Sequence, residues 1–245
     1  MSDFQPFRQL GTPKRGGPNS NGIVCVADHA SNHVPEGIEL GVAPERLGQH
    51  IAVDIGVEGI AERMARQHNI AAHLATASRL VVDLHREEDH PHVVPAESDG
   101  VLIPGNIGAD VEGRLERFYR PYHAALAEWL DAANPKLIIS LHSFTPQLET
   151  SDTARPWECA LLYNQDDRAA RHAIRLFGEQ GLDVGDNEPY SGRELNATMN
   201  RHAEAQGRYY CALELRQDLV ATRADQLRWA ALIADVAGRV ALALD

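Results

Sequence analysis

Short apolar segments alternate with longer segments of helical periodicity along most of this 245-residue chain. The apolar segments are predicted strands, at 22–28, 79–86, 136–146, 158–164 and 208–219. The amphipathic segments are predicted helices, at 54–68, 110–133 (with a bend expected at Pro121), 166–181 and 223–244. Strands that alternate with helices usually form a mostly parallel sheet covered on both faces. The pattern therefore predicts an α/β fold. We expect one domain at 22–245, because no repeat or linker divides it.

The first 21 residues differ from the rest in composition. Residues 1–21 are rich in Gly, Pro, Asn and Ser, and we expect a loose arm there. This segment lacks the apolar stretch of a secretory signal, and no apolar run in the chain is long enough to cross a bilayer. The three cysteines lie far apart in apolar runs, which is typical of buried thiols in a reducing compartment. These features favour a cytoplasmic protein that does not bind membranes.

The charge of the chain bears on its partners. The formal net charge is −12, which argues against non-specific binding of nucleic acid, because that needs clustered Lys and Arg. A small anionic substrate remains compatible with this charge, since one or two local arginines can dominate the field in a cleft. No P-loop or G-x-G-x-x-G motif occurs, which disfavours phosphate transfer and dinucleotide chemistry.

Polar side chains follow or end four of the predicted strands. In chain order they are Asp28 and His29, then Asp83, His85 and Arg86, then His142 and Ser143, and finally Glu214 and Arg216. In parallel sheets, ligands bind beyond the carboxyl ends of the strands. The sequence therefore predicts that these side chains converge on one functional site.

Two histidines in this set point to a metal. His29 and His142 come from separate predicted strands, and two imidazoles with a carboxylate and a water describe a catalytic zinc site. Such an ion lowers the pKa of its water and polarises a carbonyl group. The alternative is that each histidine only caps a strand. The third ligand stays open between the amide oxygen of Asn32 and the carboxylate of Asp54, which could instead cap a helix.

The remaining polar residues suggest proton transfer and anion binding. Glu214 interrupts an apolar strand, where a carboxylate is costly without a function, so we expect a general base; the alternative is an ion pair with Arg216. Arg86, with Arg79, is the candidate to bind a substrate carboxylate through two parallel hydrogen bonds, and a surface ion pair is its alternative. Ser143 and Arg216 are further candidate substrate contacts. No G-x-S-x-G elbow surrounds Ser143, which disfavours a serine hydrolase.

Seven stretches, in order from residue 28 to 219, resemble those of the N-formylglutamate amidohydrolase family. They are DHASNHVP, HIAVDIG, SRLVVDLHR, SDGVLIPGN, LHSFTP, NEPYSG and LELRQDL. The resemblance implies a fold similar to zinc-dependent carboxypeptidases and aspartoacylase-like deacylases, with a mixed eight-stranded sheet flanked by helices. It also implies a His-x-x-Glu motif and a distant histidine as zinc ligands, and a glutamate base on a late strand.

Carried over by position, the resemblance makes His29 the first zinc ligand and His142 the last. Asn32 stands where the carboxypeptidase pattern has glutamate, and Asp54 is the residue that would compensate. Glu214 resembles the general base. DLHR resembles an Asp-Leu-Asn-Arg signature that holds the substrate carboxylate, so His85 replaces the asparagine and Arg86 is kept.

The resulting functional hypothesis is a zinc-dependent amidohydrolase that releases formate from an N-formyl amino acid such as N-formyl-L-glutamate. A second hypothesis keeps the hydrolysis and changes the substrate to another N-acyl amino acid, a γ-glutamyl amide or a short peptide, because His85 occupies the recognition position. A third is a non-enzymatic module that binds a metal or a small molecule, motivated by Asn32.

Overall fold

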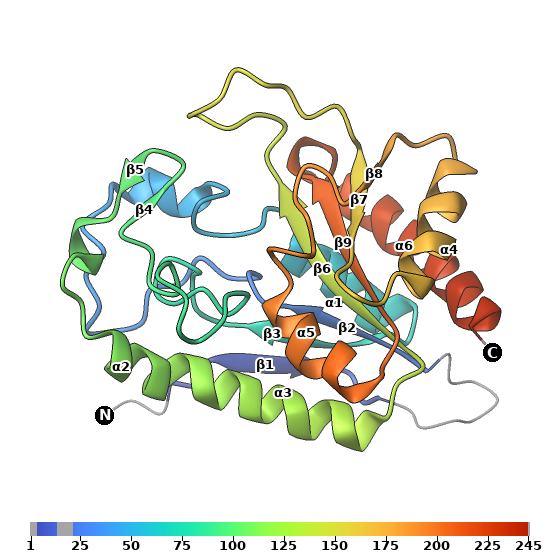
Figure 1. Cartoon of the computed structure of the whole chain (residues 1–245), viewed down its shortest axis with the longest axis horizontal. Helices are drawn as coiled ribbons and strands as arrows, with labels where there is room; N and C mark the ends of the chain where they lie inside the picture. The colour runs from blue at the N-terminus through green and yellow to red at the C-terminus, as the bar shows by residue number, and fades with distance from the viewer. Residues whose placement is uncertain (1–3, 14–21, 245) are drawn as a thin grey trace.

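A computed structural model describes residues 4–13 and 22–244 of the chain (Figure 1). Its centre is a sheet of seven strands in the order β1-β3-β2-β6-β9-β7-β8. The strands are β1 (Phe7–Leu10), β2 (Ile23–Ala27), β3 (Ala71–Ala75), β6 (Leu137–Phe144), β7 (Cys159–Leu162), β8 (Val184–Asp186) and β9 (Tyr210–Arg216). β3, β2, β6 and β9 run parallel to one another and β8 runs parallel to β7, whereas β1 and β7 pair antiparallel with β3 and β9. The sheet is thus mixed and mostly parallel, as predicted, with one strand fewer among the described residues than the family resemblance implied.

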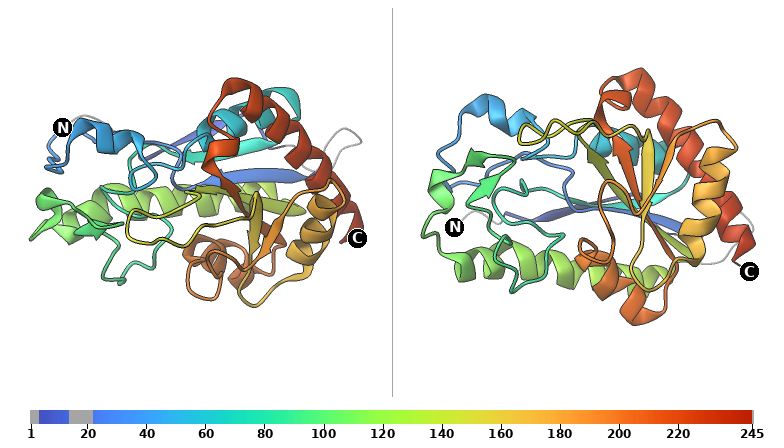
Figure 2. Two further views of the ribbon diagram at one scale, coloured as in Figure 1. Left: turned by 90° about the horizontal axis from the view of Figure 1, so that it is seen from above. Right: turned by 45° about the horizontal axis from the view of Figure 1, so that its top comes forward.

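Helices cover both faces of this sheet, and α3 and α6 lie on opposite sides of it (Figure 2). One layer consists of α1 (Val57–Gln67), α4 (Arg168–Gly178) and α6 (Arg223–Ala243). The other consists of α2 (Val111–Arg114), α3 (Arg120–Ala133) and α5 (Ala197–His202). The remaining elements are a small hairpin of β4 (Glu97–Ser98) and β5 (Val101–Leu102), and short helical turns at η1 (Pro44–Gly48), η2 (Pro104–Asn106), η3 (Leu115–Tyr119), η4 (Glu204–Gln206) and η5 (Gln217–Leu219).

β2 shows why the strands at the centre of the sheet are apolar throughout. Ile23, Cys25 and Ala27 pack into the core shared with α1 and α6, and Val24 and Val26 pack into the core shared with α3. A strand buried on both faces needs a continuous apolar run rather than an alternating one. All three cysteines of the chain are buried and free of disulfides, as expected.

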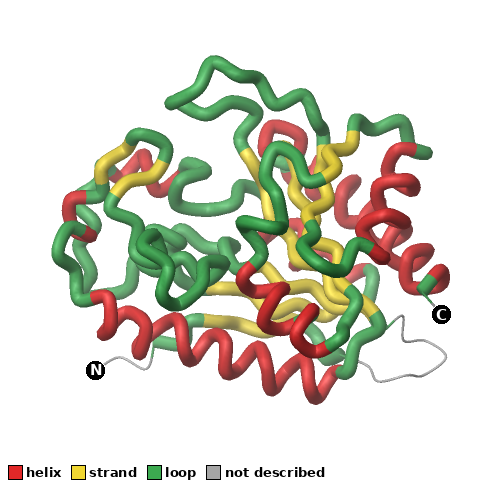
Figure 3. Tube along the Cα trace, viewed as in Figure 1, coloured by secondary structure: helices red, strands yellow, loops and turns green. Residues whose placement is uncertain are grey.

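The predicted strand at 79–86 is wrong. The strand in this region is β3, at Ala71–Ala75, and residues 79–86 form turns closed by local hydrogen bonds such as Val81 N to Ser78 O and Arg86 N to Asp83 O. Val81, Val82 and Leu84 are nevertheless buried in the core beside α3. A short apolar run records burial and not backbone conformation, so its pattern could not separate a buried turn from a strand. Figure 3 shows how much of the chain between β3 and α3 is loop.

The loose arm expected at 1–21 is wrong at residues Phe7–Leu10, which form β1 at the edge of the sheet. The Phe7 ring stacks on the His73 ring of β3, with their centroids 5.0 Å apart. Residues 1–3 and 14–21, also part of that prediction, lie outside the described residues.

The predicted helices form close to their expected ranges. The segment at 110–133 is helical from α2 through α3, with the π-helical turn η3 directly before Arg120 and Pro121. Proline has no N–H to donate, so the irregular turn falls where the regular bond pattern is lost. α6 begins after Thr222, whose hydroxyl accepts a hydrogen bond from Asp225 N. No helix within residues 4–13 and 22–244 combines the length and the apolar character that a membrane span requires.

Candidate active site

The carboxyl ends of β2, β6 and β9 lie side by side at one edge of the sheet. His142 of β6 stands in register with Glu214 of β9, and Val26 of β2 stands in register with Ser140 of β6. The residues that follow Val26 therefore come level with His142. This edge opens into a cavity of about 310 Å³. Its lining includes His29, Asp54, Arg79, Asp83, His85, Arg86, His142, Ser143, Tyr190 and Glu214. Three of the four predicted strand ends therefore meet at one edge. Asp83, His85 and Arg86 reach the cavity from a turn instead of a strand, and Asp28 and Arg216 are not among its lining residues.

His29 is buried and held between two carboxylates. Its Nε2 lies 2.7 Å from Asp83 Oδ1, and because a carboxylate can only accept, Nε2 donates. Its Nδ1 is buried without a hydrogen-bond partner and lies 3.4 Å from Asp54 Oδ2. Burial and Arg79 act to lower the pKa of His29, but Asp83 and Asp54 outweigh them and raise it to about 9. The surroundings of Nδ1 therefore favour positive charge.

Asp54 joins His29 to His142. Its backbone N–H donates to the His29 carbonyl over 3.0 Å, which fixes the start of this segment beside β2. Its Oδ2 lies 2.9 Å from His142 Nδ1 and 3.3 Å from Ser143 N. Burial acts to raise the pKa of Asp54, but the charge of His29 and the hydrogen bond from His142 hold it well below its usual value. The N-cap of α1 is Gly56, so Asp54 is not a helix cap.

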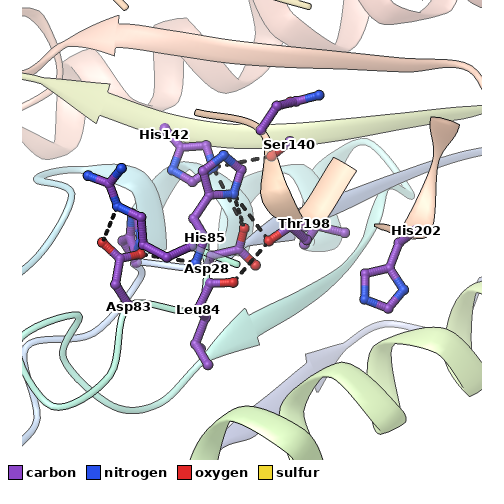
Figure 4. A network of polar contacts seen from close by, with 12 residues as sticks. Asp28, Asp83, Leu84, His85, Ser140, His142, Thr198 and His202 are labelled. Atoms are coloured by element: carbon purple, nitrogen blue, oxygen red, sulfur yellow. Dashed lines mark hydrogen bonds and ion pairs between the residues drawn. The ribbon is translucent and has the colours of Figure 1, made fainter. Parts of the chain in front are cut away.

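Within residues 4–13 and 22–244, two groups of three His or Asp side chains have ligand atoms within 4.8 Å of one another. The first is His29, Asp54 and His142, and the second is Asp28, His85 and His142. In the second group the atoms are already engaged: Asp28 Oδ1 accepts from the Tyr122 hydroxyl over 2.5 Å, and Asp28 Oδ2 lies 2.9 Å from His85 Nδ1. Figure 4 shows His85 held between Asp28 and Thr198 in this way. Asp28 therefore orients His85, and of these two groups only the first has a buried imidazole nitrogen without a hydrogen-bond partner.

Glu214 enters the cavity from β9 with an unsatisfied carboxyl. Its Oε2 is buried and has no hydrogen-bond partner. Burial, and then the negative charge of Asp54, raise the pKa of Glu214 to about 8. A carboxyl with a pKa near neutrality can both take up and release a proton, as a general acid–base group must. The alternative ion pair with Arg216 does not form.

Three predicted site residues are placed elsewhere or are engaged in other bonds. Arg216 does not line the cavity, because its guanidinium donates to Asp218 and to the Pro156 carbonyl. Asn32 is exposed and lies outside the cavity, and its Nδ2 donates to the Leu47 carbonyl over 3.0 Å. Of the two candidates for the third metal ligand, Asp54 is therefore the one that the structure places beside His29 and His142. Ser143 lines the cavity, but its hydroxyl donates to the Ile55 carbonyl, which gives it a structural bond.

The two arginines of the cavity differ in how firmly they are paired. Arg79 donates to Asp83 over 2.8 Å and to Asp54 over 3.4 Å, so its charge is used within the site. Arg86 has a single looser ion pair, with its Nε 3.7 Å from Asp83 Oδ2. The alternative, a surface ion pair of Arg86 with Glu87 or Glu88, is not found among the described residues, and Glu88 binds Arg120 instead. Arg86 is therefore the better placed of the two to bind an anion.

Sequence reasoning missed residues that meet only through loops. His50 lines the cavity with its Nε2 2.9 Å from Asp99 Oδ2. Asp99 has φ of 45° at the turn between β4 and β5 and also accepts from the backbone of Glu149 and Thr150. Tyr190, in the loop before α5, lines the cavity as well. Asp99 and Tyr190 lie in the family motifs SDGVLIPGN and NEPYSG. These motifs were the sequence signal that could have identified the two residues as part of the site.

The family model for N-formylglutamate amidohydrolase matches residues 21–221, a span that contains every cavity residue named above. The chain belongs to this family. Membership in the N-formylglutamate amidohydrolase family supports an amidohydrolase activity and confirms the resemblance found in the sequence.

Two solved structures extend this family assignment at the level of the fold. A gene product from Agrobacterium tumefaciens is 26% identical, with a TM-score of 0.89 over 98% of this chain and 96% of that one. The N-formylglutamate amidohydrolase from Ralstonia eutropha is 21% identical, with a TM-score of 0.74 over 98% of each chain. At such identity the second comparison shows a shared fold. No curated protein matches the sequence.

Proposed function

We propose that this enzyme hydrolyses the N-acyl amide bond of an N-acyl amino acid such as N-formyl-L-glutamate, giving the free amino acid and formate, with a divalent cation bound at His29, Asp54 and His142. One observation carries the proposal. Two buried atoms without a hydrogen-bond partner, the imidazole nitrogen His29 Nδ1 and the carboxyl oxygen Glu214 Oε2, belong to residues that line the same cavity. Unsatisfied buried polar groups are costly, so their persistence at one cavity favours a bound group and a reaction there.

The residues at this edge fit a metal ion. His29 Nδ1, Asp54 and His142 Nδ1 offer two imidazoles and one carboxylate, the donor set of many catalytic zinc sites. The second nitrogen of each imidazole is also held, by Asp83 on His29 and at 3.2 Å from Ser140 Oγ on His142. Such outer bonds fix the tautomer and orientation of ligating histidines. A cation bound there would supply Lewis acidity toward the acyl carbonyl and a lowered pKa for water.

Glu214 is the proposed proton carrier. Its carboxylate takes a proton from the attacking water and, as the carbon–nitrogen bond breaks, passes that proton to the departing amine. The burial of Glu214 keeps bulk solvent away from its carboxyl group. The positive charge of Arg79 offsets part of the repulsion from Asp54 and so acts to lower the pKa of Glu214. Glu214→Gln removes this exchange and keeps the size of the side chain.

Arg86 is the proposed anchor for the substrate carboxylate. Its guanidinium lines the cavity, and its loose pairing with Asp83 leaves donors for a bidentate bond. His85 lies next to it in the chain, also lines the cavity, and is oriented by Asp28 and Thr198. A cavity of about 310 Å³ is at the small end of ligand sites, which suits a single amino acid derivative.

The test is release of formate from N-formyl-L-glutamate by the zinc-loaded enzyme, with Glu214→Gln as the inactive control. Formate release by the wild type that the control lacks would support the proposal. No release from any N-acyl amino acid would refute it.

A second substrate class is favoured by His85. It stands where the family pattern has asparagine, so the bonds available to the substrate differ. A panel of N-formyl, N-acetyl and γ-glutamyl compounds tests this, and a higher kcat/KM for another acyl donor than for N-formyl-L-glutamate would favour the second class.

A further inference from the structure

Tyr190 is a cavity residue that the site described so far leaves without a role. It lies in the loop between β8 and α5, and its ring packs against the core beside α3. Its hydroxyl oxygen accepts a hydrogen bond from Arg155 over 2.8 Å, and the Arg155 guanidinium lies 4.7 Å from the centre of its ring. Arg155 comes from the long loop between β6 and β7, so two loops meet at this contact.

The bond from Arg155 decides what the Tyr190 hydroxyl can do. A phenol has one hydrogen to donate, and a guanidinium can only donate, so the Tyr190 hydrogen is not used in this contact. Among residues 4–13 and 22–244 no acceptor engages that hydrogen, and the Arg155 guanidinium donates to the Thr145 carbonyl and the Tyr190 hydroxyl rather than to a carboxylate. Burial, and then the charge of Glu214, raise the pKa of Tyr190, which keeps the hydroxyl protonated. Tyr190 is thus a hydrogen-bond donor without an acceptor in the part of the chain that the structure describes.

The loop that carries Tyr190 is built to hold it in place. Asn187 has φ of 54°, and its Oδ1 accepts from both Tyr163 N and Gly192 N, each over 3.0 Å. A Cβ on Gly192 would lie 2.5 Å from Tyr163 N, so only glycine allows this approach. The two ends of the loop are therefore pinned to the end of β7, with Tyr190 between them.

We propose that Tyr190 is a catalytic residue that donates a hydrogen bond to the acyl carbonyl oxygen of the substrate, and that Arg155 is its positioning residue; this rests on the hydrolytic function proposed above. When water adds to the acyl carbon, the carbonyl oxygen gains negative charge, and a fixed donor stabilises that charge. The Tyr190 hydrogen stays on Tyr190. The water proton passes through Glu214 to the amine, the carbon–nitrogen bond breaks, and the carbonyl double bond re-forms in the released acid.

A second Arg–Tyr pair in the same chain provides a matched control. Arg171 donates to the Tyr163 hydroxyl over 2.7 Å and lies 4.8 Å from the centre of its ring, much as Arg155 does at Tyr190. The Tyr163 hydroxyl, however, donates to Asp186 over 2.6 Å, and Tyr163 does not line the cavity. Tyr163→Phe therefore removes a similar bonded hydroxyl away from the substrate.

The first experiment compares kcat and KM of Tyr190→Phe and Tyr163→Phe on N-formyl-L-glutamate. Loss of one oxyanion donor typically lowers kcat by about 10²–10³-fold. We expect a loss of at least about 10²-fold for Tyr190→Phe with KM little changed, and none for Tyr163→Phe. Free glutamate lacks the acyl carbonyl, so its affinity for Tyr190→Phe, measured by calorimetry, should equal that of the wild type. An unchanged kcat, or a raised KM with unchanged kcat, overturns the proposal.

The role of Arg155 is tested by rescue and by non-additivity. Arg155→Ala should lower kcat, and Arg155→Lys should recover part of it, because an ammonium can still donate to the Tyr190 oxygen. Arg155→Ala added to Tyr190→Phe should cause no further loss, since Arg155 acts through that hydroxyl. Additive losses refute the positioning role.

The outcome also separates the two proposals. If wild type hydrolyses N-formyl-L-glutamate, Glu214→Gln does not, and Tyr190→Phe is fully active, the function stands and the role of Tyr190 falls. If the wild type hydrolyses no N-acyl amino acid, both fall.

Discussion

Among the buried histidines of residues 4–13 and 22–244, two pairs have different partners, and we call them the upper group (His29 and His142) and the lower group (His123 and His202). His29 and His142, at the edge of the sheet, contact the carboxylates of Asp83 and Asp54. His123 and His202, beneath them, bind each other: the nitrogens are 2.9 Å apart, the rings are stacked, and His123 Nε2 donates to a backbone carbonyl. Burial acts to lower the pKa of a histidine in both groups. Asp83 and Asp54 nevertheless raise the pKa of His29 to about 9, whereas burial and then the charge of His85 keep the pKa of His142 lowered.

In the lower group the opposing charges are too weak to cancel the effect of burial. Burial lowers the pKa of His123 to about 3 and that of His202 to about 4, and Asp28 offsets only part of it. The comparison teaches that carboxylate partners can outweigh burial, as they do at His29. We propose that the carboxylates prepare the upper group to bind a cation. A carbonyl and a second imidazole contact the lower group, which stays neutral as part of the core.

Removal of a ligand from the upper group should have the largest effect. Asp54→Asn and His29→Ala should lose both bound zinc and hydrolytic activity while the far-UV circular dichroism spectrum stays native, because each removes one of only three protein donors. Metal content after dialysis, measured by mass spectrometry, checks this. Asn32→Ala is the control and should keep both, and zinc retained by Asp54→Asn would break the comparison.

Glu214→Gln should leave zinc content intact and lower kcat by about 10²–10⁴-fold, the usual contribution of general acid–base catalysis. The amide fills the same space but cannot carry the proton. Steady-state kinetics and metal analysis of the same sample test this prediction. A loss of zinc in this variant would instead make Glu214 a ligand.

Asp83→Ala tests the outer bond of His29. Because Asp83 holds Nε2 and so orients Nδ1, its loss should weaken zinc binding by about 10–100-fold, as is typical for outer-shell carboxylates. Competition with a chelator measures the affinity. Asp218→Ala removes an exposed carboxylate that pairs with Arg216 and should leave the affinity unchanged. Equal affinity in both variants would argue against this role.

The lower group predicts a pH dependence of stability. The unfolded chain binds a proton at each histidine near pH 6.5, whereas folded His123 and His202 do not until about pH 3 to 4. The unfolded state therefore binds more protons between these values, and the free energy of unfolding falls as the pH falls from 6.5 toward 4. Each pKa unit of difference corresponds to about 1.4 kcal/mol.

This change in the free energy of unfolding is the smallest effect that we predict. Urea denaturation of the wild type and of His202→Gln at pH 7.5 and pH 5 measures it. The glutamine can still donate to His123 but does not titrate in this range. His202→Gln should therefore lose less stability than the wild type on acidification. An equal loss in both proteins would show that other groups cause it.

The sequence revealed the site where a strand delivers the side chain directly. His29, His142 and Glu214 end apolar runs that became β2, β6 and β9, and parallel neighbours must end at one edge. Asp54 could not be separated from Asn32, because their distance from His29 depends on the fold of the loop between them.

Features that depend on two distant loops were not accessible from pattern. Arg155 and Tyr190 come from two loops that are far apart in the sequence, and hydrophobic periodicity cannot predict that these loops are in contact. β1 was missed because its partner β3 was also missed, and a four-residue edge strand carries little signal of its own. The buried turn at 79–86 shows the same limit, since apolar composition reports burial more directly than backbone conformation.

The central claim is that the histidines with carboxylate partners form the metal centre. Anomalous diffraction at the zinc edge, from crystals of the zinc-loaded protein, tests it most directly. We predict one peak within bonding distance of His29, Asp54 and His142, with Glu214 beside it. A peak at Asp28 and His85, or a fully active enzyme with no peak at this edge of the sheet, would contradict the account.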